Sequence, residues 1–171
     1  METLKIIDQL IVDGSFDDAE NICKVKLDEI NNLENKSDSS FSLLFGLSAL
    51  LIDLAHFTNK NNLGKLGLKL MLDNEKKFLE LFSHRDFFYN LANAKSNLID
   101  CDNSYELTFE NIEELVDAKN CYFKALKEKL HNDESSLELY VNLANILKRQ
   151  FRLTEAINYY DLVNSYNVDI G

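Results

Sequence analysis

The chain contains no proline and only five glycines in its 171 residues. These two residue types most often interrupt helices and bound strands. No stretch between turn residues shows the alternation of apolar and polar residues that is typical of a strand. Because 46% of the residues are apolar, the chain can bury a sizeable core. We therefore expect an all-α protein with long helices and short polar loops.

Arginine is scarce as well, with only Arg85, Arg149 and Arg152 present. Lysine and arginine together number 18 against 29 acidic residues, which gives a formal net charge of −11. Phosphate contacts from lysine and arginine supply most of the affinity of proteins for nucleic acids. We therefore expect no nucleic-acid partner and no anionic membrane surface. This charge favours a basic protein partner.

The three cysteines, Cys23, Cys101 and Cys121, are odd in number and widely separated. This pattern fits neither a disulfide framework nor a zinc site, so we expect a reducing compartment and no metal. The N-terminal segment METLKIIDQL lacks the basic and long apolar parts of a signal peptide. The apolar run Phe41–Ile52 has the length of a buried helix and is too short for a membrane span. A cytoplasmic location is the resulting prediction.

The most regular stretch is 137–169, in which two apolar stripes recur at helical spacing. The first stripe contains Tyr140, Leu143, Ala144 and Leu147, and the second contains Leu153, Ala156, Ile157, Tyr160 and Val163. Residues three and four positions apart share one face of a helix. The stretch therefore predicts two helices packed as a hairpin, with the small Ala144 and Ala156 allowing a close approach of the backbones.

An upstream segment repeats this pattern. Phe88, Asn90, Leu91, Ala92 and Asn93 correspond to Tyr140, Asn142, Leu143, Ala144 and Asn145, and Ala118, Tyr122 and Ala125 correspond to Ala156, Tyr160 and Val163. The earlier copy is longer between its two helices, so we expect an insertion at 99–110. Over 87–169 the pattern resembles the tetratricopeptide repeat, whose period is about 34 residues. Lys95 in an apolar place and Phe151 in a glycine place depart from that family's pattern.

The resemblance implies a right-handed superhelix of stacked antiparallel helix pairs, with about 7–8 helices in a single domain over 1–171. We expect a degenerate helix pair at 1–32, where Gly14, Phe16 and Ala19 match the pattern GxFxxA. A loop at 33–39 precedes a second pair at 40–82, whose later part is expected to break at Asp73-Asn74. Its first helix is apolar nearly all round, which is typical of a central helix. The clearer repeats occupy 84–131 and 134–169.

The first helix of each clear copy carries a stripe of polar residues along one side, at positions i, i+4, i+7 and i+11. It contains Asp86, Asn90, Asn93 and Asn97 in one copy and Glu138, Asn142, Asn145 and Arg149 in the other. In tetratricopeptide proteins this side of the first helix lines a concave groove, and the stripe resembles asparagine ladders that hold an extended peptide. One amide offers an acceptor and two donors, so it can pair with both polar groups of a peptide unit. The resemblance implies a non-catalytic peptide-binding module. The alternative is that these asparagines are solvated or bond across the repeat interface.

The segment from Asp100 to Asp117 contains seven carboxylates and neither lysine nor arginine. Its beginning is similar to a calcium loop, but Tyr105 stands where a tight turn needs glycine and Asn111 stands where a glutamate should close the site. Contact with a basic partner and a plain solvated face are the other interpretations. The acidic residues are Asp100, Asp102, Glu106, Glu110, Glu113, Glu114 and Asp117.

The chain has no GxSxG sequence and no cysteine in a recognisable nucleophile motif. We therefore expect neither enzymatic activity nor a cofactor. Two other functions stay open. The chain could be the N-terminal sensory or oligomerisation domain of a larger effector enzyme. It could also be a structural homodimer that pairs through Tyr159, Tyr166 and Val168 of the C-terminal helix pair.

Overall fold

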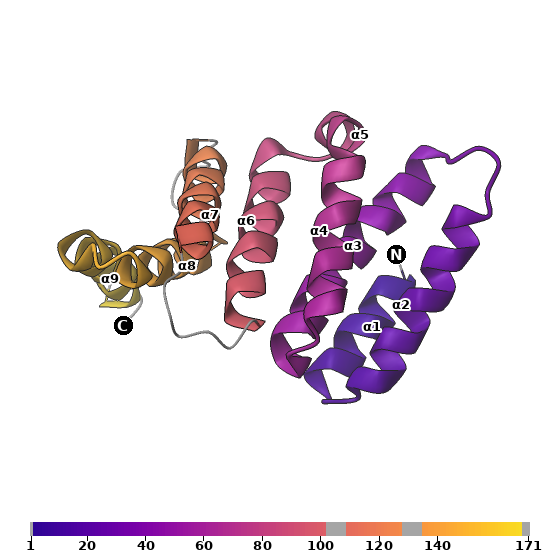
Figure 1. Ribbon diagram of the computed structural model, residues 1–171, viewed down its shortest axis with the longest axis horizontal. Helices are drawn as coiled ribbons and strands as arrows, with labels where there is room; N and C mark the ends of the chain where they lie inside the picture. Colours follow the sequence, from indigo (N-terminus) through magenta and orange to yellow (C-terminus); the bar gives the residue numbers. More distant parts are fainter. Residues whose placement is uncertain (1, 102–108, 128–134, 169–171) are drawn as a thin grey trace. The chain divides into compact units, whose positions relative to one another are not determined.

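The computed structural model describes residues 2–101, 109–127 and 135–168, and every regular element in these ranges is an α-helix. The described residues form nine helices, which are labelled in Figure 1: α1 (Glu2–Val12), α2 (Phe16–Asn31), α3 (Asp38–Thr58), α4 (Asn61–Asp73), α5 (Glu75–Leu81), α6 (His84–Cys101), α7 (Phe109–Lys127), α8 (Ser135–Arg149) and α9 (Leu153–Val168). The predicted all-α class is confirmed for these ranges. The predicted 7–8 helices were too few, because 61–82 forms two helices.

The break between α4 and α5 lies at Asn74. Its side-chain Nδ2 donates a hydrogen bond of 2.8 Å to the carbonyl of Leu70. Its backbone has left the helical region, with φ −117° and ψ 13°. Asparagine side chains compete with the backbone for such carbonyls and thereby interrupt helices. The break predicted at Asp73-Asn74 is confirmed.

The helices group into two compact units whose boundary falls inside α6. The first unit comprises Met1–Ser83 with Asn97–Ser104, and the second comprises His84–Ser96 with Tyr105–Gly171. Both units contain buried apolar side chains. The single domain expected over 1–171 stays a prediction.

In the first unit α3 is the central helix, because it packs against α1, α2, α4 and α5. Its buried residues lie on several sides: Leu44, Phe45, Leu47, Ser48, Leu50, Leu51, Ile52, Leu54 and Ala55. The expectation that this apolar stretch is too short for a membrane span counted only Phe41–Ile52. Helix α3 has 21 residues, and by length and composition it could cross a bilayer, while half of its apolar window is buried inside the protein. The sequence prediction of a central helix apolar nearly all round is confirmed.

The close packing of α4 on α3 requires glycine at position 67. A Cβ atom added to Gly67 would lie 2.7 Å from the backbone oxygen of Ser48 and 2.9 Å from Cγ1 of Ile52. Backbone cannot move aside as a flexible side chain can, so any larger residue would separate the helices. Glycine at this position sets the distance between the two helices.

Two turns far apart in sequence have the same local structure. Gly14, between α1 and α2, has φ 76°, and Phe151, between α8 and α9, has φ 58°. The residue after each donates its N–H to a carbonyl five positions earlier, Ser15 to Leu10 at 2.8 Å and Arg152 to Leu147 at 2.9 Å. Such bonds terminate helices at a left-handed residue. Five positions beyond the left-handed residue stands an alanine, Ala19 or Ala156, with 0% or 1% of its surface exposed.

The turn between α3 and α4 also has a left-handed residue, with a small buried residue five positions later. Asn59 has φ 55°, and the residue five positions later is the buried Gly64. A Cβ on Gly64 would lie 3.2 Å from the Cβ of Ala55 on the facing helix. Three hairpins thus combine a left-handed turn residue with a small residue that lets the second helix approach the first.

The insertion predicted at 99–110 is helical at both of its ends. Helix α6 continues to Cys101 and α7 begins at Phe109, so the described ends of the insertion belong to these two helices. The remaining part, 102–108, lies outside the described residues, as does 128–134 between α7 and α8.

In the second unit α8 packs against α7 and α9. Leu115 of α7 and Leu153 of α9 hold equivalent places in the two repeat copies, yet Leu115 is fully buried and Leu153 is 54% exposed. Ile157 is 56% exposed. The prediction that Leu153 and Ile157 face inward was wrong, because α8 covers α7 while no described helix covers the outer face of α9.

Candidate functional site

The asparagines of the predicted polar stripe bring α6 and α8 together. Asn142 on α8 donates from Nδ2 to Oδ1 of Asn93 on α6 at 3.3 Å, and from the same atom to the hydroxyl of Tyr89 at 3.3 Å. Both asparagine side chains are half-buried. These helices are the first helices of the two clear repeat copies, so the contact joins consecutive copies.

A second kind of bond joins the two helices of each copy. Tyr122 on α7 donates its hydroxyl proton to Oδ1 of Asn93 at 2.6 Å. Tyr160 on α9 donates in the same way to Oδ1 of Asn145 at 2.6 Å. The tyrosines and the asparagines occupy equivalent positions in the two copies. The sequence repeat is therefore also a repeat of one side-chain hydrogen bond.

Sequence reasoning missed the role of the tyrosine hydroxyls. The helical spacing identifies Tyr122 and Tyr160 only as matched apolar positions. The available signal was that both copies have tyrosine where phenylalanine would fill the same space. Tyr89, whose ring centroid lies 6.2 Å from that of Tyr122, was also missed. A buried hydroxyl needs a hydrogen-bond partner, and the matched asparagines provide it.

The other predicted site residues are distributed unevenly. Asn90 donates from Nδ2 to the backbone oxygen of Asp86 at 2.9 Å, within its own helix. Asp86, Glu138 and Asn145 are exposed, while Arg149 and Asn97 are partly buried. Asn97 belongs to the first unit, whereas the other seven predicted residues belong to the second.

Two polar groups at the contact between Asn93 and Asn142 stay unused. No hydrogen bond within the described residues involves Nδ2 of Asn93 or Oδ1 of Asn142. One is a donor and the other is an acceptor, so together they could pair with the C=O and N–H of an extended chain. Part of the predicted ladder therefore has an internal structural role, and ligand binding by the rest stays a prediction.

Lys95 and Asp117 form an ion pair beside this cluster. Nζ of Lys95 on α6 lies 2.8 Å from Oδ2 of Asp117 on α7. Lys95 stands where the tetratricopeptide pattern has an apolar residue. Its side chain is 21% exposed and is directed to a carboxylate, so the departure from the pattern is electrostatically satisfied.

The acidic segment is described only in part. Asp102 and Glu106 lie outside the described residues, and of Asp100 and Glu110 only the backbone is described. Most of the calcium-like loop therefore lies outside the described ranges. Where side chains are described, no three His, Cys, Asp or Glu residues lie close enough together to hold a metal ion.

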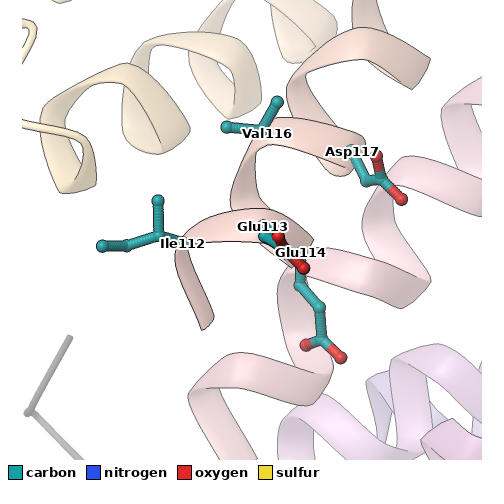
Figure 2. A pocket seen from close by; sticks show the side chains of 5 residues that line it. All are labelled: Ile112, Glu113, Glu114, Val116 and Asp117. Atoms are coloured by element: carbon teal, nitrogen blue, oxygen red, sulfur yellow. The ribbon is translucent and has the colours of Figure 1, made fainter. Parts of the chain in front are cut away.

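The described part of this segment lines a hollow at the start of α7. Its volume is about 580 Å³, and its lining residues are Ile112, Glu113, Glu114, Val116 and Asp117. Figure 2 shows Ile112 and Val116 projecting from one side of the helix, while the carboxylates of Glu114 and Asp117 point away from them. The hollow therefore combines an aliphatic pair with a group of carboxylates.

Of the three residues proposed for a homodimer, the structure describes the side chain of Tyr159 alone. Tyr159 is partly buried, and its ring stacks on Tyr140 with centroids 5.9 Å apart. Burial raises the pKa of its phenol above the ordinary value. The side chains of Tyr166 and Val168 lie outside the described residues. Tyr159 thus contributes to the contact of α9 with α8.

Comparison with protein-family models, with curated proteins and with solved structures finds no match to this chain.

Proposed function

We propose that the chain is a non-catalytic helical repeat module of the tetratricopeptide type that binds an extended segment of a partner protein. The observation that carries the proposal is the meeting of Asn93 and Asn142, which leaves one unused amide donor beside one unused acceptor. An extended chain presents the complementary pair of groups along its backbone. Binding of this kind needs no catalytic residue and no cofactor.

The repeat assignment is supported by two independent correspondences. The turns at Gly14 and Phe151 share their hydrogen bonds, and each is followed by a buried alanine. The bond from tyrosine to asparagine occurs at equivalent positions in both clear copies. Equivalent hairpins present equivalent faces when they stack, so polar groups repeated on the first helices would form a continuous row.

The small free energy of a single hydrogen bond limits what the asparagines can contribute to binding. Each hydrogen bond to a peptide group adds about 1 kcal/mol net. Two amides are therefore too few for micromolar binding, which needs roughly 8 kcal/mol. We propose that Asn90, Asn145 and nearby side chains supply further contacts. Because the amides read backbone groups, the side-chain contacts would determine which partner sequence is preferred.

A structural role for the same asparagines is the competing proposal. Asn93 already accepts two hydrogen bonds and Asn142 already donates two. If these bonds are their whole purpose, the two residues stabilise the stack of hairpins and bind nothing. This interpretation predicts a loss of stability on mutation, without a loss of affinity.

The test compares two double variants for binding and for stability. Partner proteins are recovered from cell extract with the native chain, and a synthetic segment of a recovered partner is titrated by calorimetry. We expect Asn93→Ala with Asn142→Ala to weaken binding about tenfold, since several bonds of about 1 kcal/mol are lost or misplaced. Asn120→Ala with Asn158→Ala is the matched control, because both asparagines are exposed on second helices.

The outcomes separate the two proposals. Unchanged affinity of the Asn93/Asn142 variant together with a lower thermal midpoint would leave only the structural role. Equal weakening by the Asn120/Asn158 control would show that the row of first-helix amides is not the binding site.

A further inference from the structure

A second surface, on α7, has the features of a docking site and lies apart from the first-helix asparagines. The inner side of α7 is fully buried at Leu115 and Ala118. One turn apart on another side, Ile112 is 43% exposed and Val116 is 37% exposed. Both line the hollow of about 580 Å³. This aliphatic pair is therefore directed into an open space.

The carboxylates around this pair are only partly neutralised. Asp117 pairs with Lys95 at 2.8 Å. Glu113 and Glu114 are exposed, and neither forms an ion pair with any described residue. No lysine or arginine lies between Asp100 and Lys119 in the sequence. The rim of the hollow thus carries negative charge that no described residue of the chain balances.

Charge determines which occupant fits this surface. The whole chain has a net charge of −11, so a second copy would be repelled at long range. A basic segment would be attracted, and its cations would find carboxylates without partners. The segment must also carry apolar side chains that pack against Ile112 and Val116. An amphipathic segment rich in lysine or arginine meets both requirements.

We propose that the hollow at Ile112, Glu113, Glu114 and Val116 docks a basic amphipathic segment of a partner protein. The aliphatic side chains of the segment pack on Ile112 and Val116. Its long lysine or arginine side chains reach around α7 to Glu113 and Glu114, since the carboxylate of Glu114 points away from the aliphatic pair. This inference is independent of the peptide-binding function proposed above, because it uses no asparagine of the first helices.

The probe is a synthetic helical peptide of leucine and lysine, about 14 residues long, with a fluorescent label at its N-terminus. Binding to the full chain is followed by fluorescence anisotropy at low and at physiological salt. We expect Ile112→Gln with Val116→Gln to weaken binding about tenfold, because both aliphatic contacts are lost. We expect Glu113→Gln with Glu114→Gln to weaken it about threefold and to reduce its salt dependence.

Matched controls separate this site from general effects of charge and apolar surface. Asp18→Asn with Asp28→Asn removes two exposed carboxylates of α2, and Ile6→Gln with Val25→Gln removes two apolar side chains that are 50% and 48% exposed. Neither control should change binding by more than about twofold. The Asn93/Asn142 variant should bind the probe like the native chain.

Three results would overturn the proposal. The aliphatic variant could bind the probe as tightly as the native chain, or the control carboxylate variant could weaken binding as much as the Glu113/Glu114 variant. Thirdly, sedimentation could show that the native chain self-associates and that the Ile112/Val116 variant is a monomer. The occupant would then be a second copy of the chain.

Discussion

At the scale of single residues, Phe151 adopts a conformation that its side chain disfavours. Its φ of 58° lies in the left-handed region, where a Cβ atom crowds the following carbonyl. Gly14 occupies the equivalent position in the first hairpin. The ring of Phe151 is 76% exposed, so burial contributes little to offset the strain. The conformation is maintained by the hydrogen bonds of the turn.

We expect Phe151→Gly to raise the free energy of unfolding by about 1 kcal/mol, because the strain of the left-handed residue is relieved. The measurement is urea denaturation followed by circular dichroism. Thr154→Gly, in the exposed first turn of α9, is the control and should lower stability by up to about 1 kcal/mol. A destabilised Phe151→Gly protein would mean that the ring makes contacts which outweigh the strain.

At the scale of helices, the bond from tyrosine to asparagine fastens the second helix of a copy to its first. The two bonds are equally short, but their surroundings differ. Tyr122 is 2% exposed, whereas Tyr160 is partly buried and its partner Asn145 is exposed. A polar group left without a partner costs more when it is buried. Only the α6–α7 bond also touches the neighbouring copy, through Asn142.

Tyr122→Phe should therefore destabilise the protein by about 1–2 kcal/mol, and Tyr160→Phe by about 0.5 kcal/mol. Thermal or urea unfolding of both variants measures the difference. A double-mutant cycle with Asn93→Ala isolates the coupling of Tyr122 to Asn93. Equal and negligible effects of the two variants would show that the hydroxyls contribute nothing to stability.

At the scale of the whole molecule, some lysine side chains of this acidic chain form ion pairs that connect different helices. Glu20 on α2 pairs with Lys24 at 2.6 Å and with Lys60, just before α4, at 2.7 Å. Hydrogen bonds first from Lys24 and then from Lys60 hold the pKa of Glu20 below its ordinary value of 4.5. The bonds from Glu20 and Asp17 raise the pKa of Lys60 above 10.5. This cluster connects two hairpins of the first unit.

The direction of these shifts gives a pH dependence of stability. A carboxyl with a lowered pKa stabilises the fold above pH 4.5, and this contribution is lost as the pH falls through the lowered pKa. The contribution of Lys60 is present below pH 10.5 and is lost as the pH rises through its raised pKa. We expect Glu20→Gln to lower the thermal midpoint at pH 7, with the difference from the native chain vanishing in strong acid.

The control for this prediction is Asp8→Asn, which removes an exposed carboxylate that pairs with no described residue. Its midpoint should follow that of the native chain across the acid range. A constant difference between Glu20→Gln and the native chain from pH 7 to strong acid would contradict the assigned role of Glu20.

Most helix positions could be predicted because their signals are local. The stripes of Tyr140–Leu147, the apolar helix after Ser40 and the break at Asn74 depend on residues within one or two turns. The orientation of α9 could not be predicted in this way. Leu153 has the same spacing as Leu115, and only the presence or absence of a covering helix separates an exposed side chain from a buried one.

By itself, the sequence determined that this protein is helical, acidic and repetitive in 84–168, because propensity, charge and periodicity are properties of neighbouring residues. The tertiary structure alone decided which groups the repeated asparagines contact. The bond between Asn93 and Asn142 joins residues 49 positions apart. Whether such amides face each other, a tyrosine or solvent depends on how the helices pack.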